Sequence, residues 1–258
     1  MALTKVSRGL LTTSIVDNGN ATAITIDSSE NVGIGVSPEA WNTYTPLQVQ
    51  LASLSGYTNG DSRLSNNAYY AGGWKYINSI PATQYLMDAA NGVHTWSTAA
   101  SGTADAAITW QERMRISAEG YVTTPYQPAF DAHHAGGSYA SGTTASSLDL
   151  NTTRLNRGGH YNTSTDRFVA PVAGVYQFNY RTIINGAYTS GHVRMMKNAV
   201  TLPGADTHFS PTVASGWSQV LTQITVELAV DDYVQVYHLG NTSIYGDSYQ
   251  SFNGYLIG

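Results

Sequence analysis

The clearest alternation of side chains along the chain lies in the C-terminal half, at Gly174–Arg181. Successive residues of a β-strand point to opposite faces, so a period of two separates the side chains into two sets. Here the two sets are Tyr176, Phe178 and Tyr180 on one face and Val175, Gln177, Asn179 and Arg181 on the other. The pattern predicts a strand with a buried aromatic face.

Further strands are predicted toward the C-terminus. Val220–Leu228 places Thr222, Ile224, Val226 and Leu228 on one face. Asp231 and Asp232 then form a turn, and Tyr233–Leu239 reads as the next strand. The last residues, Ser251–Gly258, are expected to form a closing strand that ties this end of the chain into a sheet.

Two short hairpins are predicted in the N-terminal half. Ala23–Ile26 alternates, Asp27–Asn31 is rich in turn residues, and Val32–Gly35 runs back. Met114–Pro125 repeats this pattern without gaps. The repeat aligns Ile116 with Ile26, Gly120 with Glu30 and Val122 with Val32. Repeated hairpins on either side of a module mark joints in a modular fibre.

The segment between the hairpins is rich in tyrosine and tryptophan, with turns at Gly and Asn. We expect it to form a small β sandwich. Its predicted strands are Leu47–Leu54, Ala68–Tyr76, Gln84–Ala89, His94–Thr98 and Ala107–Arg115. Residues 1–45 contain too few large apolar side chains for a core of their own, so they favour association of several chains.

Composition narrows the class of protein. Only 11% of the residues are charged, against about 25% in an average protein, while the chain has 18 tyrosines and 25 glycines. Such a surface is typical of β-rich extracellular or virion fibres. A net charge of −5 and scattered basic residues argue against a nucleic-acid partner. No apolar run is long enough to span a membrane, no signal-peptide run is readable, and cysteine is absent.

The C-terminal half resembles the complement C1q globular-head family over roughly residues 126–258. The likeness is carried by an ordered set of positions: Leu150, Asn156, Tyr161, Phe168, Gly174, Tyr176, Phe178 and Tyr180. Leu150 stands where the family usually has Phe, a change that a core tolerates, and Asp231 stands where it usually has Gly. The resemblance implies a trimeric jelly roll related to the tumour necrosis factor fold. Some family heads bind calcium, which makes Asp231 and Asp232 candidate ligands.

The two hairpin segments are similar to segments of tail fibres in tailed bacteriophages. In those fibres the first segment reads roughly "Ile-Asp-Ser-Ser-Gly-Asn-Val-Gly-Ile-Gly", and Glu30 stands here in place of the first glycine. The second hairpin is entered through residues 112–116, "Glu-Arg-Met-Arg-Ile", which is similar to the entry of the same hairpin in phage fibres. The resemblance implies a virion appendage, assembled in the host cytoplasm, whose N-terminal segment binds other virion proteins. We therefore expect an all-β chain with three parts: a fibre hairpin segment at 1–45, a middle β module ending in the second hairpin at 46–125, and a C1q-like head at 126–258.

No catalytic motif is readable: HExxH, P-loop, GxGxxG and GxSxG patterns are all absent. We expect no enzyme activity and no cofactor other than the calcium that the family resemblance leaves open. His133 and His134 are adjacent, and neighbouring residues of a strand face opposite ways, so an exposed dipeptide is favoured over a ligand pair.

Binding is the function that the head favours. Aromatic residues among small polar ones contact sugar rings or peptides at low entropic cost. The receptor-binding candidates, expected on loops of the head, are Tyr188, His192, His208, Phe209, Trp217, Tyr245 and Tyr249. Phe209 and Trp217 could instead lie in the core or in a subunit interface.

The sequence thus predicts a homotrimeric tail fibre that binds a glycan or protein on the host surface. The alternatives are a capsid decoration fibre, a tail adaptor, a secreted C1q-like lectin or an enzyme with a divergent site.

Overall fold

The computed structural model describes residues 14–16, 22–140, 146–185, 190–210, 216–240 and 243–258. The chain divides into two compact units, 1–125 and 126–258. The division falls where the C1q-like head was expected to begin. The N-terminal sheet continues across residue 45, where we expected one segment to give way to the next.

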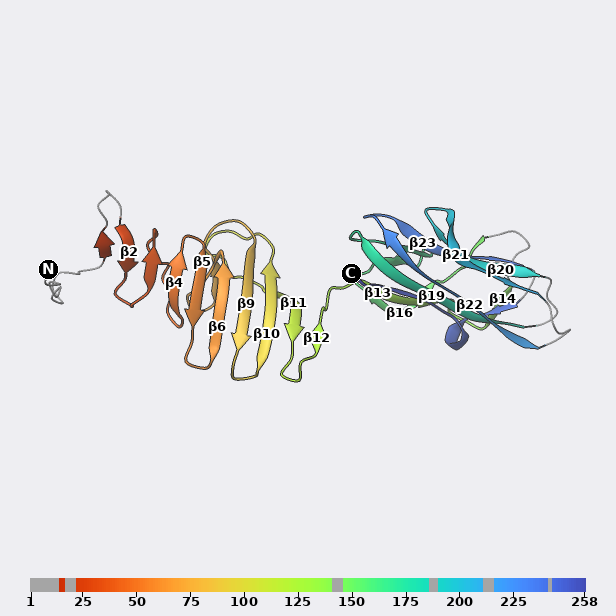
Figure 1. The fold of residues 1–258 in the computed structure, drawn as a ribbon, viewed down its shortest axis with the longest axis horizontal. Helices are drawn as coiled ribbons and strands as arrows, with labels where there is room; N and C mark the ends of the chain where they lie inside the picture. Colours follow the sequence, from red (N-terminus) through yellow and green to blue (C-terminus); the bar gives the residue numbers. More distant parts are fainter. Residues whose placement is uncertain (1–13, 17–21, 141–145, 186–189, 211–215, 241–242) are drawn as a thin grey trace, which may run out of the picture. The chain divides into compact units, whose positions relative to one another are not determined.

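Within the described part of the first unit, ten strands form one sheet, and neighbouring strands lie side by side in Figure 1. Nearly all of its pairings are antiparallel, but β3 and β4 are parallel. A separate hairpin, β7 and β8, lies outside this sheet. In spatial order the strands are β1 (Ser14–Val16), β2 (Thr22–Ile26), β3 (Val32–Ile34), β4 (Thr45–Val49), β5 (Ala52–Gly56), β6 (Asp61–Asn66), β9 (Ala82–Asp88), β10 (Val93–Ala99), β11 (Gln111–Ile116) and β12 (Val122–Thr123), and the hairpin is β7 (Ala68–Tyr70) with β8 (Trp74–Tyr76).

Both predicted hairpins are confirmed, and they share one geometry. Ile26 pairs with Val32 across β2 and β3, as Ile116 pairs with Val122 across β11 and β12. The aligned turn residues both have left-handed backbone, with φ of 66° at Glu30 and 87° at Gly120. A glycine enters this conformation without strain, whereas Glu30 carries a steric cost.

The middle segment differs from the expected sandwich, because its strands belong to the long sheet. The predicted strand Leu47–Leu54 is two strands, β4 and β5, separated by a tight turn in which Gln50 has a φ of 55°. Ala68–Tyr76 likewise folds as the β7–β8 hairpin around Gly72. Strand β6 was not predicted, because DSRLSN lacks the β-branched and aromatic residues that signal a strand.

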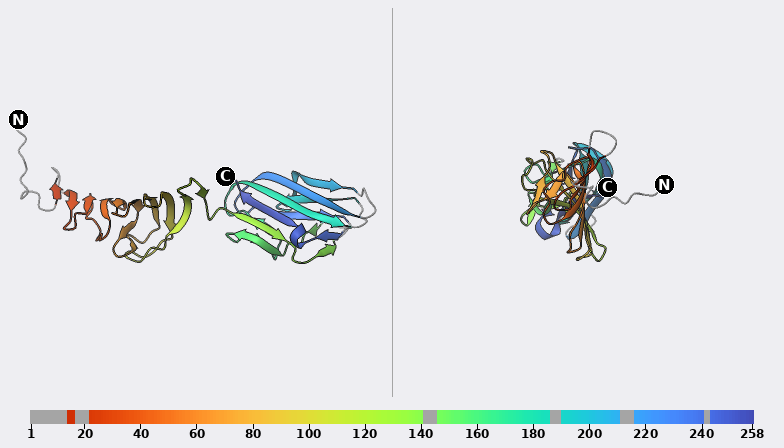
Figure 2. Two further views of the ribbon diagram at one scale, coloured as in Figure 1. Left: turned by 90° about the horizontal axis from the view of Figure 1, so that it is seen from below. Right: turned by 90° about the vertical axis from the view of Figure 1, so that its left-hand side faces the viewer.

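One face of the long sheet is covered by its own connections. The segments between β3 and β4 and between β6 and β9 carry the buried aromatic residues Trp41, Tyr44, Tyr69 and Tyr76, and the segment between β10 and β11 adds the half-buried Trp110. Figure 2 shows these connections gathered on one side of the strands. They close this face with T-shaped ring contacts such as Trp41–Trp74, whose ring centroids are 6.0 Å apart.

The second unit is a jelly roll of two packed sheets, as predicted. In Figure 1 the long strands β19 and β22 run side by side through it, and they pair in a continuous antiparallel register. The described strands of the first sheet are β13 (Ala129–His133), β14 (Ser138–Ala140), β16 (Thr152–Arg157), β19 (Gly174–Asn185), β22 (Trp217–Leu228), β24 (Ser243–Tyr245) and β25 (Ser251–Leu256). Those of the second are β15 (Ser146–Ser147), β17 (Tyr161–Asn162), β18 (Arg167–Val169), β20 (Gly191–Lys197), β21 (Val200–Phe209) and β23 (Tyr233–Leu239).

The aromatic ladder of the sequence forms the core between these two sheets. Tyr176, Phe178 and Tyr180 of β19 are all fully buried, and Phe168 of β18 packs on Phe178 with ring centroids 5.4 Å apart. Leu150, the departure from the family pattern, is also fully buried. The ladder therefore builds the core of the head.

Candidate functional site

The sequence-predicted candidates of the head fall into two groups on different sheets. His192, His208 and Phe209 belong to the second sheet, and Trp217, Tyr245 and Tyr249 belong to or adjoin the first. Tyr188 lies outside the described residues. The expectation that all these residues lie on loops is wrong for most of them: they occupy strand ends, because the strands of the head run further than the sequence pattern indicated.

The first group surrounds a small cavity at the ends of β20 and β21, which we call the histidine pocket. Its volume is about 230 Å³. His192 and His208 are direct cross-strand partners, and their ring centroids lie 4.8 Å apart. His192 is buried, whereas the His208 side chain is 74% exposed. The residues that line the cavity are Ser190, Gly191, His192, His208, Phe209, Ser210 and Leu239.

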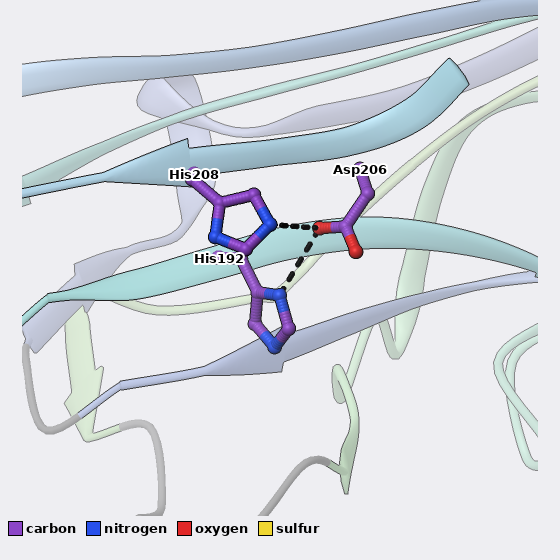
Figure 3. Close-up of side chains that lie close together, drawn as sticks. All are labelled: His192, Asp206 and His208. Carbon is purple, nitrogen blue, oxygen red and sulfur yellow. Dashed lines mark ion pairs between the residues drawn. The ribbon is translucent and has the colours of Figure 1, made fainter. Parts of the chain in front are cut away.

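Asp206 joins the two imidazoles of the pocket (Figure 3). Its Oδ1 lies 3.1 Å from Nδ1 of His192 and 3.7 Å from Nε2 of His208. Burial lowers the pKa of His192, and Arg194 and His208 add to this effect, while Asp206 opposes it.

Arg194 completes this polar network. Its Nη2 lies 2.6 Å from Nε2 of His192, and its Nε lies 3.4 Å from Oδ2 of Asp206. Asp206 and Arg194 were missed in the sequence. The sequence feature that could have indicated them is the alternation in two strands, His192-Val-Arg194 and Asp206-Thr-His208. Because these strands are neighbours, the alternation puts all four polar side chains on one face.

The donor set of the pocket is one that transition-metal ions use. His192, Asp206 and His208 each offer a ligand atom, and these atoms lie within 4.8 Å of one another among the described residues. The guanidinium of Arg194, however, contacts both His192 and Asp206. A fixed positive charge beside a candidate cation site opposes metal binding, so the arrangement is better suited to hydrogen bonding of a polar ligand.

Phe209 is a structural residue of the pocket. It packs against the core of the head and stacks on His238 with ring centroids 5.6 Å apart. A Cβ on Gly191 would lie 2.5 Å from its ring, so the small residue there makes room for Phe209. Of the two alternatives left open for Phe209, the structure supports the core.

The second group forms an exposed aromatic cluster, which we define as Trp217, Tyr245 and Tyr249. The rings of Trp217 and Tyr245 are 4.4 Å apart between centroids, and Tyr249 lies 6.2 Å from Trp217 and 6.1 Å from Tyr245. Trp217 begins β22, Tyr245 ends β24, and Tyr249 ends the short 3-10 helix η1 (Asp247–Tyr249). Trp217 and Tyr249 are each 55% exposed.

The register explains why this cluster is open. Tyr245 is opposite Ile183 on β19, and Trp217 is opposite the residue two further along β19. Thr182 and Ile184, which alternate with these positions along β19, are buried. Tyr245 and Trp217 therefore lie on the face of the first sheet that points away from the core.

The calcium candidates do not form a cation site. Asp232 accepts hydrogen bonds from the Asn198 amide and the Ala229 N–H, and its Oδ2 lies 2.7 Å from Nζ of Lys197. These contacts lower the pKa of Asp232 to about 2. Asp231 is exposed and has a φ of 67° in the turn. A lysine already neutralises the one carboxylate that could anchor the ion, so the donor set does not fit calcium.

The two packed sheets define a jelly-roll domain. The model of the C1q domain family matches residues 129–257, half of the chain, and the chain belongs to this family. Domains of this kind typically form homotrimers and bind receptors. The described residues contain no helix of the length and apolarity needed to cross a lipid bilayer.

Each of the following similar solved structures covers about half of the chain. The globular domain of zebrafish complement 1qA protein is 19% identical and matches 51% of this chain and 98% of its own, with a TM-score of 0.41. Eiger TNF from S. frugiperda is 11% identical, with 51% and 94% covered and a TM-score of 0.40. Murine APRIL at pH 5.0 is 12% identical, with 51% and 99% covered and a TM-score of 0.40. No curated protein matches the chain.

Proposed function

We propose that this chain is a non-enzymatic structural protein of a tailed bacteriophage, a trimeric tail fibre whose C1q-domain head binds a glycan or protein on the host surface. The first unit, with its two fibre-like hairpins, attaches the head to other virion proteins. The hairpin segments support the phage assignment through their resemblance to tail-fibre sequences and through their shared register. The protein then resides in the virion after assembly in the host cytoplasm.

The observation that carries receptor binding is the aromatic cluster of the head. Trp217 and Tyr249 are more than half exposed, although large aromatic residues gain most by burial. Their rings present flat apolar faces beside polar edges, which suits stacking on sugar rings or on side chains of a protein receptor. Three heads on one fibre multiply a weak contact into useful avidity.

The same face of the sheet could instead pack against a neighbouring subunit, so the test must separate the two roles. Full-length chain, fluorescently labelled, is added to a panel of bacterial strains, and adsorption and sedimentation are measured for Trp217→Ala and for Tyr121→Ala. Tyr121 is a matched control because it is 70% exposed and belongs to the first unit. We expect Trp217→Ala to reduce adsorption about tenfold or more, the loss of one hot-spot aromatic residue, and to remain trimeric.

Two results would contradict the receptor-binding role. One is adsorption by Trp217→Ala equal to that of the unchanged chain. The other is dissociation of Trp217→Ala into monomers, which would assign the cluster to subunit packing. Release of sugar from host polysaccharide by the purified chain would contradict the proposal that the protein is not an enzyme. Electron micrographs of labelled particles decide between the tail fibre and the capsid or adaptor alternatives.

A further inference from the structure

The long sheet of the first unit has its polar and apolar faces reversed relative to an ordinary protein sheet. The face covered by the chain's own connections carries buried polar residues, namely Gln48, Ser53, Ser55, Ser65, Gln84 and Thr95. The opposite face is open and carries large exposed apolar side chains. A sheet normally buries its apolar face. In a single chain these apolar side chains remain in contact with water, so the free energy that their burial would contribute to stability is not realised.

The open face carries a continuous row of apolar side chains, one from each of eight neighbouring strands. Directly paired residues share a face, so the register proves that the row is continuous. Four more apolar residues lie beside it in the same way. We call this surface the apolar strip; its row is Ile26, Val32, Leu47, Leu54, Leu64, Tyr85, Trp96 and Met114, and its flank is Ile24, Ile34, Val49 and Ala52.

The strip is exposed and long. Leu47, Leu54 and Leu64 at its middle are 40%, 51% and 54% exposed. With strands about 4.8 Å apart, a row across eight strands extends roughly 34 Å. A continuous apolar surface of this kind marks an interaction site, since scattered exposed apolar residues do not line up in register.

Two hollows lie along the strip and could receive side chains of a partner. One, of about 150 Å³, is lined by apolar residues that include Leu47, Leu54 and Leu64. The other, of about 480 Å³, is lined by Leu64, Tyr85 and Trp96 together with polar residues, among them Thr98 and Arg113. The smaller hollow is therefore shaped to receive apolar side chains, and the larger one offers both apolar and polar contacts.

The chemistry of the strip suits further copies of the same chain. None of its twelve residues is charged, although the chain as a whole has a net charge of −5. When copies meet around an axis that runs along the strip, each residue lies beside the same residue of its neighbours. Leucine beside leucine is favourable in that position, whereas any charged residue would meet its own charge.

We propose that three copies of this chain bury their apolar strips against one another about a common axis in the first unit. The number three rests on the trimeric head of the proposed function, which holds three first units at high local concentration because each is covalently joined to its head. Each strip then meets two others, and the three sheets enclose a small apolar core. The first unit thereby contributes to the trimer independently of the contacts within the head.

Cysteine cross-linking tests this interface, because the chain contains no cysteine. Leu54→Cys is oxidised in the full-length protein and compared with Ile80→Cys on denaturing gels. Ile80 is a matched control: it is 44% exposed, belongs to the same unit and lies in the connection between β6 and β9, outside the strip. We expect Leu54→Cys to give a covalent dimer in most molecules and Ile80→Cys to remain monomeric on the gel. Leu64→Cys repeats the test on the next strand.

Sedimentation of the unchanged chain separates failure of this inference from failure of the proposed function. A trimer in which Leu54→Cys and Leu64→Cys cross-link no more than Ile80→Cys would overturn the apolar interface and leave the trimeric head intact. A monomer without cross-links would overturn both. A trimer in which Leu54→Cys and Leu64→Cys cross-link but Ile80→Cys does not supports the proposal.

Discussion

Asn156 holds both main-chain groups of Tyr161 in the head: its Nδ2 donates to the Tyr161 carbonyl at 2.9 Å, and its Oδ1 accepts from the Tyr161 N–H at 3.0 Å. The amide thereby bridges the Gly158–Gly159 turn and presents the Tyr161 ring to Phe130, with centroids 5.0 Å apart. Asn156 thus has a structural reason to belong to the family signature, since its carboxamide carries a donor and an acceptor on two separate atoms that reach both main-chain groups at once.

Replacing Asn156 with Ala is expected to destabilise the head by about 2 kcal/mol, because two backbone groups lose their partner. Calorimetry of the full-length chain measures the shift of the melting transition of the head. Asn162→Ala serves as the control, since Asn162 is exposed and accepts a single turn hydrogen bond from Ser164. Equal effects of the two substitutions would show that the bridge contributes no special stability.

Gly254 of β25 is required by close packing. An added Cβ would lie 2.5 Å from the Phe178 ring and 2.9 Å from the Phe130 ring. Both rings are buried and cannot move aside, so we expect Gly254→Ala to cost roughly 1–3 kcal/mol or more of stability. Gly137→Ala is the control, because a Cβ there would have no atom within 4 Å. Chemical denaturation followed by tryptophan fluorescence compares the two, and an unchanged midpoint for Gly254→Ala would contradict the prediction.

His238 makes the head sensitive to acid. It is buried, its two ring nitrogens have no hydrogen-bond partner in the described structure, and burial lowers its pKa to about 4. A histidine whose pKa is lower in the folded than in the unfolded state is protonated mainly on unfolding. The free energy of unfolding is therefore unaffected by this titration above about pH 6.5. It falls as the pH drops toward 4, by roughly 3 kcal/mol in total.

The substitution His238→Phe removes this titration and keeps an aromatic ring beside Phe209. We expect its free energy of unfolding to fall less between pH 7 and pH 4 than that of the unchanged chain. His208→Gln, at an exposed imidazole, is the control variant. Denaturation midpoints measured across this pH range test the prediction, and parallel curves for His238→Phe and the unchanged chain would refute it.

Asp232 stabilises the turn between β22 and β23 through Lys197 and Asn198. Because these contacts lower its pKa to about 2, its contribution is present above about pH 4 and is lost as the pH falls toward 2. Asp232→Asn is expected to cost about 1 kcal/mol at neutral pH, a value kept small by solvent screening. Asp231→Asn is the matched control, since asparagine tolerates the left-handed backbone of that position. A greater loss of melting temperature for Asp231→Asn would contradict this assignment.

The sequence by itself determined the local features of the molecule. A period of two placed Tyr176, Phe178 and Tyr180 on the core face, and hydrophobic burial alone then required that face to be covered. The two repeated hairpins were readable for the same reason, because a hairpin's register depends on its turn residues and on a few neighbouring positions.

Only the tertiary structure decided which strands pair and what each face contacts. Asp206 joined His192 and His208 because β20 and β21 are neighbours in one register, which neither segment specifies alone. The predicted strand Leu47–Leu54 is divided at Gln50 by a left-handed turn that contains neither proline nor glycine, so no turn residue marked it in the sequence. The apolar strip became visible only when eight strands were in register, since alternation within a strand separates two faces but does not say which of them the fold will cover.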